Sequence, residues 1–203
     1  MSDLHHRFSS HIKFVDTTLE PNLDFSHHAY ELGKWIFVIS LLQLLLCIPT
    51  PSKLKLHQRL YIAAIYLWLP LLPVLLYSAG TAVLTLQSDI DNRWYGTTTG
   101  SYIFLRLYNA LNIVGILVEF FSWWSEGGGW KELKGRSASI GHHIFSVCAY
   151  VVVLLFFNNQ MHYFACLDGL CEITTIHLTM LQLSKLKDKY KLGKQKIWCV
   201  SDC

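Results

Sequence analysis

Polar and ionisable side chains recur at helical spacing inside three otherwise apolar stretches of the sequence. Steps of three, four and seven residues place side chains on one face of an α-helix. Groups of this kind are costly to bury, so by default they mark a binding site, a pathway or a set of internal hydrogen bonds. The three stripes are Asn109, Asn112, Glu119 and Ser122; His142 or His143 with Ser146 and Tyr150; and Asp168, Glu172, Thr175 and Thr179.

The pair His142 and His143 has the most definite chemistry. A histidine beside a carboxylate can act as general base for a hydroxyl or amine that attacks an acyl group, or it can accept the acyl group covalently. The same polar groups can instead hydrogen-bond across helices and only fix the helix register, and the residues alone leave both interpretations open. If the three polar faces turn toward one another, the interior also holds Asn112, Glu119, Ser146, Asp168, Glu172 and Thr175.

Metal binding is not expected, and no cofactor is predicted. The four histidines in or near the apolar stretches do not follow the repeated HxxHH spacing of membrane desaturases. The six cysteines form no CxxC pair and are interpreted as small buried hydrophobes. His27 and His28 lie in a polar segment and are expected to be solvated, while Arg106 is expected to extend toward lipid headgroups.

Composition indicates which elements carry these stripes. Of the 203 residues, 52% are hydrophobic and 15% are charged, whereas a soluble domain carries about 25% charged residues. This balance argues against a disordered chain and against an ordinary cytosolic enzyme. The net charge of +3 is too small to indicate a nucleic-acid partner. The predicted fold class is all-α, a polytopic transmembrane helix bundle.

About five spans are expected, because roughly 20 apolar residues cross the hydrocarbon core of a bilayer. Pro70 and Pro73 should kink the second span without ending it. The first span is short and needs a further turn from residues 29–34. The five expected spans are Trp35–Ile48, Ile62–Leu86, Leu107–Trp124, Ile140–Phe157 and Tyr163–Leu183.

Basic residues concentrate in every second connection, which predicts the orientation of the chain. The first connection holds Lys53, Lys55 and Arg59 without an acidic residue, and the tail is rich in lysine. By the positive-inside rule, the N-terminus lies outside and the C-terminus inside, which requires an odd number of crossings. The chain is expected to divide into a polar segment, 1–34, a membrane bundle, 35–186, and a basic tail, 187–203.

The region from Leu107 to Leu183 resembles the TLC-domain family of translocation-associated membrane proteins and Lag-type ceramide synthases. The resemblance rests on His142 and His143 at the head of an apolar helix, and on Glu172–Thr175, which is similar to the family's Glu-Leu-Ser-Thr element. The sequence differs where Ile176-His177 follows this element, because the family usually has Pro-Phe there. Family members also commonly continue with one or two further spans.

The resemblance implies an integral protein of the endoplasmic reticulum or another organelle membrane, the mitochondrial inner membrane included. Its expected partners are membrane lipids, with other membrane protein subunits as an alternative and no nucleic acid. The leading interpretation is a membrane protein that binds or handles lipid within its helix bundle, without catalysis. The alternatives are an accessory subunit of a larger membrane complex, and a ceramide-synthase-like, acyl-CoA-dependent N-acyltransferase. The acyltransferase would use His142 and His143, with Glu172 orienting them.

Overall fold

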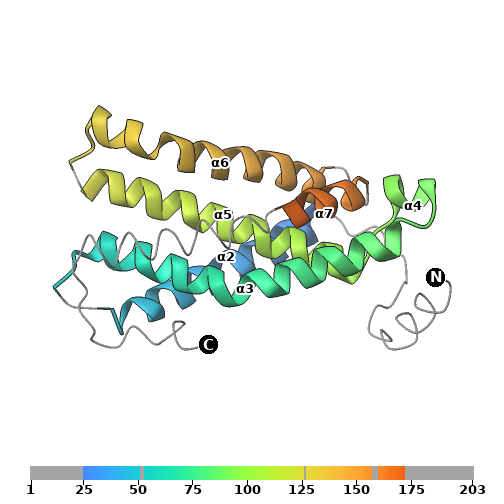
Figure 1. Ribbon diagram of the computed structural model, residues 1–203, viewed down its shortest axis with the longest axis horizontal. Helices are drawn as coiled ribbons and strands as arrows, with labels where there is room; N and C mark the ends of the chain where they lie inside the picture. Colours follow the sequence, from blue (N-terminus) through green and yellow to red (C-terminus); the bar gives the residue numbers. More distant parts are fainter. Residues whose placement is uncertain (1–24, 51–52, 126, 157–159, 172–203) are drawn as a thin grey trace.

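The computed structural model describes residues 25–50, 53–125, 127–156 and 160–171, and the regular structure in these ranges is entirely helical (Figure 1). The prediction of an all-α bundle is therefore confirmed. The helices are α2 (Phe25–Cys47), α3 (Leu56–Leu86), α4 (Ile90–Tyr95), α5 (Thr99–Ser125), α6 (Trp130–Leu155) and α7 (His162–Leu170).

Within the described ranges, four largely helical stretches are long and apolar enough to cross a membrane: Phe25–Cys47, Leu56–Leu86, Ile90–Ser125, which joins α4 to α5, and Ser137–Leu155. This is the architecture of a multi-pass integral membrane protein. The fifth expected span begins in α7, and its part beyond Cys171 lies outside the described residues. Helix α2 runs through the expected boundary between residues 34 and 35, because residues 29–34 do continue the first span. The boundary expected at residue 186 lies outside the described residues.

Helix α3 continues through both of its prolines, as the sequence predicts, and runs for 31 residues. Its C-terminal half packs closely against α5. A Cβ atom on Gly100 would lie 2.8 Å from the carbonyl oxygen of Ser78 and 2.9 Å from Oγ1 of Thr81. Small residues are typical of such close helix contacts in membranes, because they let the two backbones approach.

Helix α5 is the central element of the bundle. It packs against α2, α3, α6 and α7, and the most apolar part of the stretch Ile90–Ser125 is 56% buried, compared with 22% for Phe25–Cys47 and for Ser137–Leu155. Its aromatic side chains fill the interior: Phe104 stacks on Tyr108 with ring centroids 5.3 Å apart, and Tyr108 meets Tyr150 of α6 edge to face at 5.0 Å. The core is thus occupied by tightly packed rings from α5 and α6.

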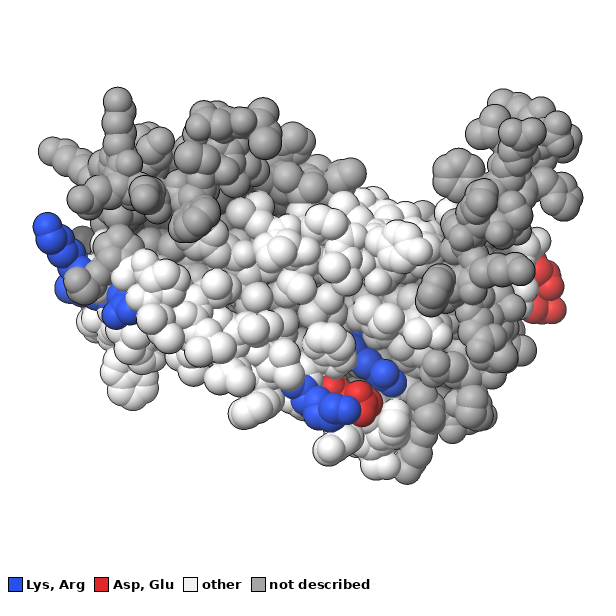
Figure 2. Space-filling view, turned by 90° about the horizontal axis from the view of Figure 1, so that it is seen from below, with Lys and Arg blue, Asp and Glu red and all other residues white. Residues whose placement is uncertain are grey.

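Successive long helices run antiparallel, so their ends gather at two ends of the molecule (Figure 1). The N-terminal ends of α2, α5 and α7 lie at one end with the C-terminal ends of α3 and α6, and α4 lies there too. The connections from α2 to α3 and from α5 to α6 lie at the other end. On the face shown in Figure 2, charged side chains gather toward the two ends and in one cluster between them, while the rest of the described surface is uncharged.

Candidate functional site

Two side-chain hydrogen bonds join α5 to α6 along one line, which we call the α5/α6 seam. Asn112 Oδ1 and His143 Nδ1 are 2.6 Å apart. About two turns further along α5, Glu119 accepts at Oε1 a hydrogen bond of 3.2 Å from the hydroxyl of Ser139 on α6. Asn112 and Glu119 are buried, with 1% and 6% of their surface exposed. The two contacts lie on the polar stripe of α5 that the sequence predicts.

A glycine makes room for the histidine in this seam. A Cβ atom on Gly115 would lie 3.3 Å from both Cε1 and Nε2 of His143. This distance is tighter than ordinary van der Waals contact, so a larger residue at position 115 would press on the imidazole ring. The amide of Asn112 also donates to the carbonyl oxygen of Tyr108 at 2.9 Å, which orients its Oδ1 toward α6.

The two adjacent histidines have different environments. His143 lies in the seam and is half-buried, whereas the side chain of His142 is exposed on another side of α6. The two rings are 5.5 Å apart. Neighbouring residues on a helix point about 100° apart, so only one member of such a pair can face the same helix. The spacing left open whether His142 or His143 lies on the polar face of this helix. The structure places His143 against α5.

The remaining candidate residues lie further along the bundle. Ser146 is buried on α6, and the hydroxyl of Tyr150 donates to Oδ2 of Asp168 on α7, whose side chain is exposed at the surface. The contacts from Ser139 to Tyr150 thus extend over about 16 Å of α6 at 1.5 Å per residue. They are cross-helix pairs distributed along the bundle. Glu172 and Thr175 lie outside the described residues.

This arrangement supports hydrogen bonding more directly than acyl transfer. The partner of His143 Nδ1 is an amide, and within the described ranges no hydrogen bond joins His142 to a carboxylate. In many enzymes a third group orients the general base, which must also come within reach of the proton that it abstracts. Within the same ranges, no group of three or more His, Cys, Asp or Glu side chains is positioned to hold a metal ion.

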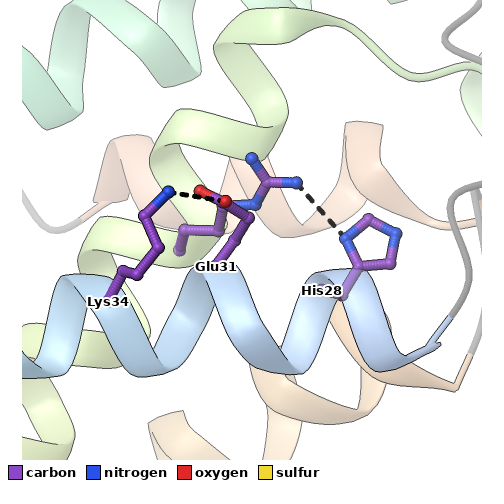
Figure 3. Close-up of polar contacts among 4 residues, drawn as sticks. His28, Glu31 and Lys34 are labelled. Carbon is purple, nitrogen blue, oxygen red and sulfur yellow. Dashed lines mark hydrogen bonds and ion pairs between the residues drawn. The ribbon is translucent and has the colours of Figure 1, made fainter.

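A second polar cluster lies toward the opposite end of α5 and was not anticipated from the sequence. The guanidinium of Arg106 approaches His28 of α2, with Nη2 3.4 Å from Nδ1, a contact that Figure 3 marks with a dashed line to His28. The guanidinium also lies over the ring of Tyr102, 5.1 Å from its centroid. Beyond Tyr102, the ring of His162 on α7 accepts or donates a hydrogen bond with Oγ of Ser101 at 2.9 Å. We call these five residues the Arg106 cluster.

The expectation that His27 and His28 are both solvated is wrong for His28, which is only 2% exposed. The physical reason is that α2 begins at Phe25, so His28 belongs to the buried face of the helix. That face follows a helical period over His28, Leu32, Ile39, Gln43 and Cys47. Extending the first apolar span toward the N-terminus with this period would have found the residue.

Comparison with known proteins found no matching family model, no matching curated protein and no matching solved structure. The resemblance to the TLC-domain family therefore stays a prediction based on short sequence motifs.

Proposed function

We propose that this multi-pass membrane protein binds lipid along the exposed side of α6 and does not catalyse a reaction on it. The observation that carries the proposal is a stripe of exposed side chains on α6. An imidazole, His142, heads the stripe, and the apolar side chains of Phe145, Val152 and Phe156 follow at helical steps. A polar group followed by an apolar track matches the division of a lipid into headgroup and acyl chain.

The hydrogen bonds within the α5/α6 seam support the part of the proposal that assigns no catalysis to the protein. His143 is engaged with Asn112, and the aromatic rings of α5 and α6 fill the neighbouring core. Hydrogen bonds of this kind between membrane helices stabilise the bundle by about 0.6–2 kcal/mol each. Holding α5 and α6 together is thus enough to explain why these polar groups, which resemble an acyl-transfer site, are present. The proposed location is the endoplasmic reticulum or another organelle membrane.

The test compares lipid retained by purified protein after reconstitution in nanodiscs, measured by native mass spectrometry. Phe145→Asn places an amide in the proposed acyl track at a side chain that is 75% exposed, and Leu84→Asn on α3, at 60% exposed, is the matched control. We expect Phe145→Asn to lower lipid retention several-fold and Leu84→Asn to leave it unchanged. Equal retention by both variants would remove the support for a site on α6.

The enzymatic alternative has its own measurement. The wild-type protein is incubated with an acyl-CoA and a long-chain base, and the amide product is measured. Formation of product that is lost in His142→Ala or in His143→Ala would overturn the proposal and favour the N-acyltransferase. We expect no product with either the wild type or the variants.

An accessory role in a larger membrane complex is a second candidate, favoured by the spacing on the same stripe. The steps from His142 through Phe145, Ala149, Val152 and Phe156 are three, four, three and four residues, which is the pattern of a helix that packs against another helix. Cysteine at position 145 should then form a disulfide or a short cross-link to a partner protein in native membranes. A lipid-facing stripe gives no such specific product.

A further inference from the structure

The Arg106 cluster contains a cation whose charge is not matched by an ion pair among the described residues. Lys34 and Glu31 of α2 form the one ion pair found there, with Nζ and Oε1 2.7 Å apart (Figure 3). The described hydrogen-bond partner of the Arg106 guanidinium is the imidazole of His28, a neutral acceptor at 3.4 Å. With Glu31 engaged by Lys34, these three charged side chains together carry one excess positive charge.

Hydrogen-bonding capacity is also left over in this cluster. Nε of Arg106 and Nε2 of His28 are buried nitrogen atoms without a hydrogen-bond partner among the described residues. Because Nδ1 of His28 accepts from Arg106 when the ring is neutral, its Nε2 carries the hydrogen. A buried donor without a partner is costly. The cluster therefore has both an excess positive charge and unused hydrogen-bond donors. An anion that accepts hydrogen bonds would satisfy both.

The surroundings hold the guanidinium in a fixed orientation. Arg106 lies over the face of Tyr102, whose ring also stacks with that of His28 at a centroid distance of 5.2 Å. Tyr102 is 2% exposed and cannot shift easily, whereas Arg106 is only half-buried. A planar guanidinium that presents its N–H groups from a rigid support is the arrangement proteins use to bind two oxygens of a phosphate or carboxylate.

The position along the helices indicates where the anion would come from. Arg106 is seven residues from the start of α5, or about 10 Å along its axis at 1.5 Å per residue. His28 is three residues from the start of α2. The side chains of arginine residues near a helix end extend toward the headgroup region of the bilayer, where phosphate groups are concentrated.

We propose that Arg106, positioned by His28 and Tyr102, binds a phosphate group at this end of the bundle. The phosphate belongs to an anionic phospholipid headgroup or to a free phosphate ion, which share the same chemistry at the site. Glu31 lies close enough to Arg106 to interact with its charge, and its Oε1 accepts a hydrogen bond from Lys34. This site is separate from the stripe on α6 and does not depend on it.

The lipid arm of the test uses full-length protein reconstituted from vesicles of phosphatidylcholine alone or with phosphatidic acid. Native mass spectrometry measures the ratio of phosphatidic acid to phosphatidylcholine that is retained. We expect the wild type to enrich phosphatidic acid several-fold and Arg106→Gln to abolish the enrichment. Arg106→Lys, which keeps the charge and the fold but loses the planar fork, should retain part of it. Lys53→Gln, an exposed lysine at the other end, is the matched control and should not change it.

The soluble arm measures the thermal stability of the detergent-purified protein with and without inorganic phosphate, using sulfate-free buffer at constant ionic strength. A phosphate-dependent increase in the wild type, absent in Arg106→Gln and without lipid enrichment, identifies a free anion as the source. Glu31→Gln tests the remaining explanation, which is that Glu31 itself is required for the effect. Under the proposal it leaves phosphate binding intact or tightens it.

The proposal is overturned if neither phosphatidic acid nor inorganic phosphate distinguishes the wild type from both Arg106 variants. It is also overturned if Glu31→Gln abolishes the effect as fully as Arg106→Gln does, because Glu31 would then be required at the site. Loss of lipid from the α6 stripe in Phe145→Asn should leave the phosphatidic acid enrichment unchanged, so the two proposals fail independently.

Discussion

Side chains with similar chemistry have different environments in this bundle, even when they are adjacent in sequence. His143 contacts a buried amide, and His142 is exposed one residue earlier. His28 is buried beside Arg106 while His27 is exposed. The role of each residue is therefore decided by the helix face on which it lies, and substitutions within each pair should separate these roles.

His143→Ala is expected to lower the free energy of unfolding by about 1–2 kcal/mol, because it leaves the Oδ1 atom of Asn112 without its partner. His142→Ala removes an exposed side chain and should change it by less than about 0.5 kcal/mol. The measurement is reversible unfolding in mixed detergent micelles. A larger loss for His142→Ala than for His143→Ala would contradict the assignment of the two rings.

At the scale of single helices, close backbone approach and terminal hydrogen bonds position the elements around α5. Helix α7 approaches α5 so closely that a Cβ atom on Gly169 would lie 2.1 Å from Cζ of Phe104. The ring of Phe104 cannot move away freely, because it is 1% exposed and stacked on Tyr108. At the opposite end, Arg59 of α3 joins α2 by donating to Oγ1 of Thr50 at 2.8 Å and to the carbonyl oxygen of Cys47 at 2.5 Å.

Gly169→Ala should destabilise the protein by about 1–3 kcal/mol, since the added methyl group overpacks the contact between α7 and α5. Gly141→Ala is the matched control on α6, where a Cβ atom meets nothing within 4 Å. There the higher helix propensity of alanine should stabilise the protein by up to about 1 kcal/mol. Unfolding measurements should therefore show a lower free energy of unfolding for Gly169→Ala and a higher one for Gly141→Ala. The same sign for both would show that α7 does not pack on Phe104.

Arg59→Ala is expected to cost about 1–3 kcal/mol, because the last turn of α2 loses a charge-assisted hydrogen bond to its terminal carbonyl group. Lys53→Ala, at an exposed lysine of the same connection, should be close to neutral. Limited proteolysis of the α2–α3 connection is a suitable measurement, and only Arg59→Ala should accelerate cleavage. Equal cleavage of the two variants would argue against a specific role of the guanidinium.

For the whole molecule, the antiparallel helices bring alternate connections to the same end, and this arrangement agrees with the distribution of charge. Lys53 and Lys55 lie in the connection from α2 to α3, and Arg59 lies in the first turn of α3, while Asp89 and Asp91 lie at the opposite end with α4. The positive-inside rule then orients the molecule with α4 outside. This orientation is a prediction that labelling from the two sides of the membrane can test.

Single cysteines introduced at positions 53 and 91 in a cysteine-free background provide the measurement. Both native side chains are exposed, so access to each cysteine depends mainly on the side of the membrane. In sealed vesicles of known orientation, an impermeant maleimide should label position 91 from the outer side and position 53 only after permeabilisation. The reverse pattern would invert the topology, and labelling of both from one side would contradict the crossing of α3.

The sequence alone determined the helical class and the approximate location of the membrane spans. Length and composition suffice for this, because a chain in hydrocarbon must satisfy its backbone hydrogen bonds internally, and apolar stretches of about 20 residues form helices to do so. The polar stripe on α5 was also predictable from its spacing. The number of spans beyond α6 stays a prediction, since the rest of the fifth expected span lies outside the described residues.

Only the tertiary structure decided how the helices are rotated about their axes and which of them meet. Periodicity defines the faces of a helix, but packing selects the face that turns inward, and the space beside Gly115 selected His143 over its neighbour. The same packing brought His28 to Arg106 across 78 residues of sequence. No local pattern encodes that contact, because it depends on the simultaneous approach of α2, α5 and α7.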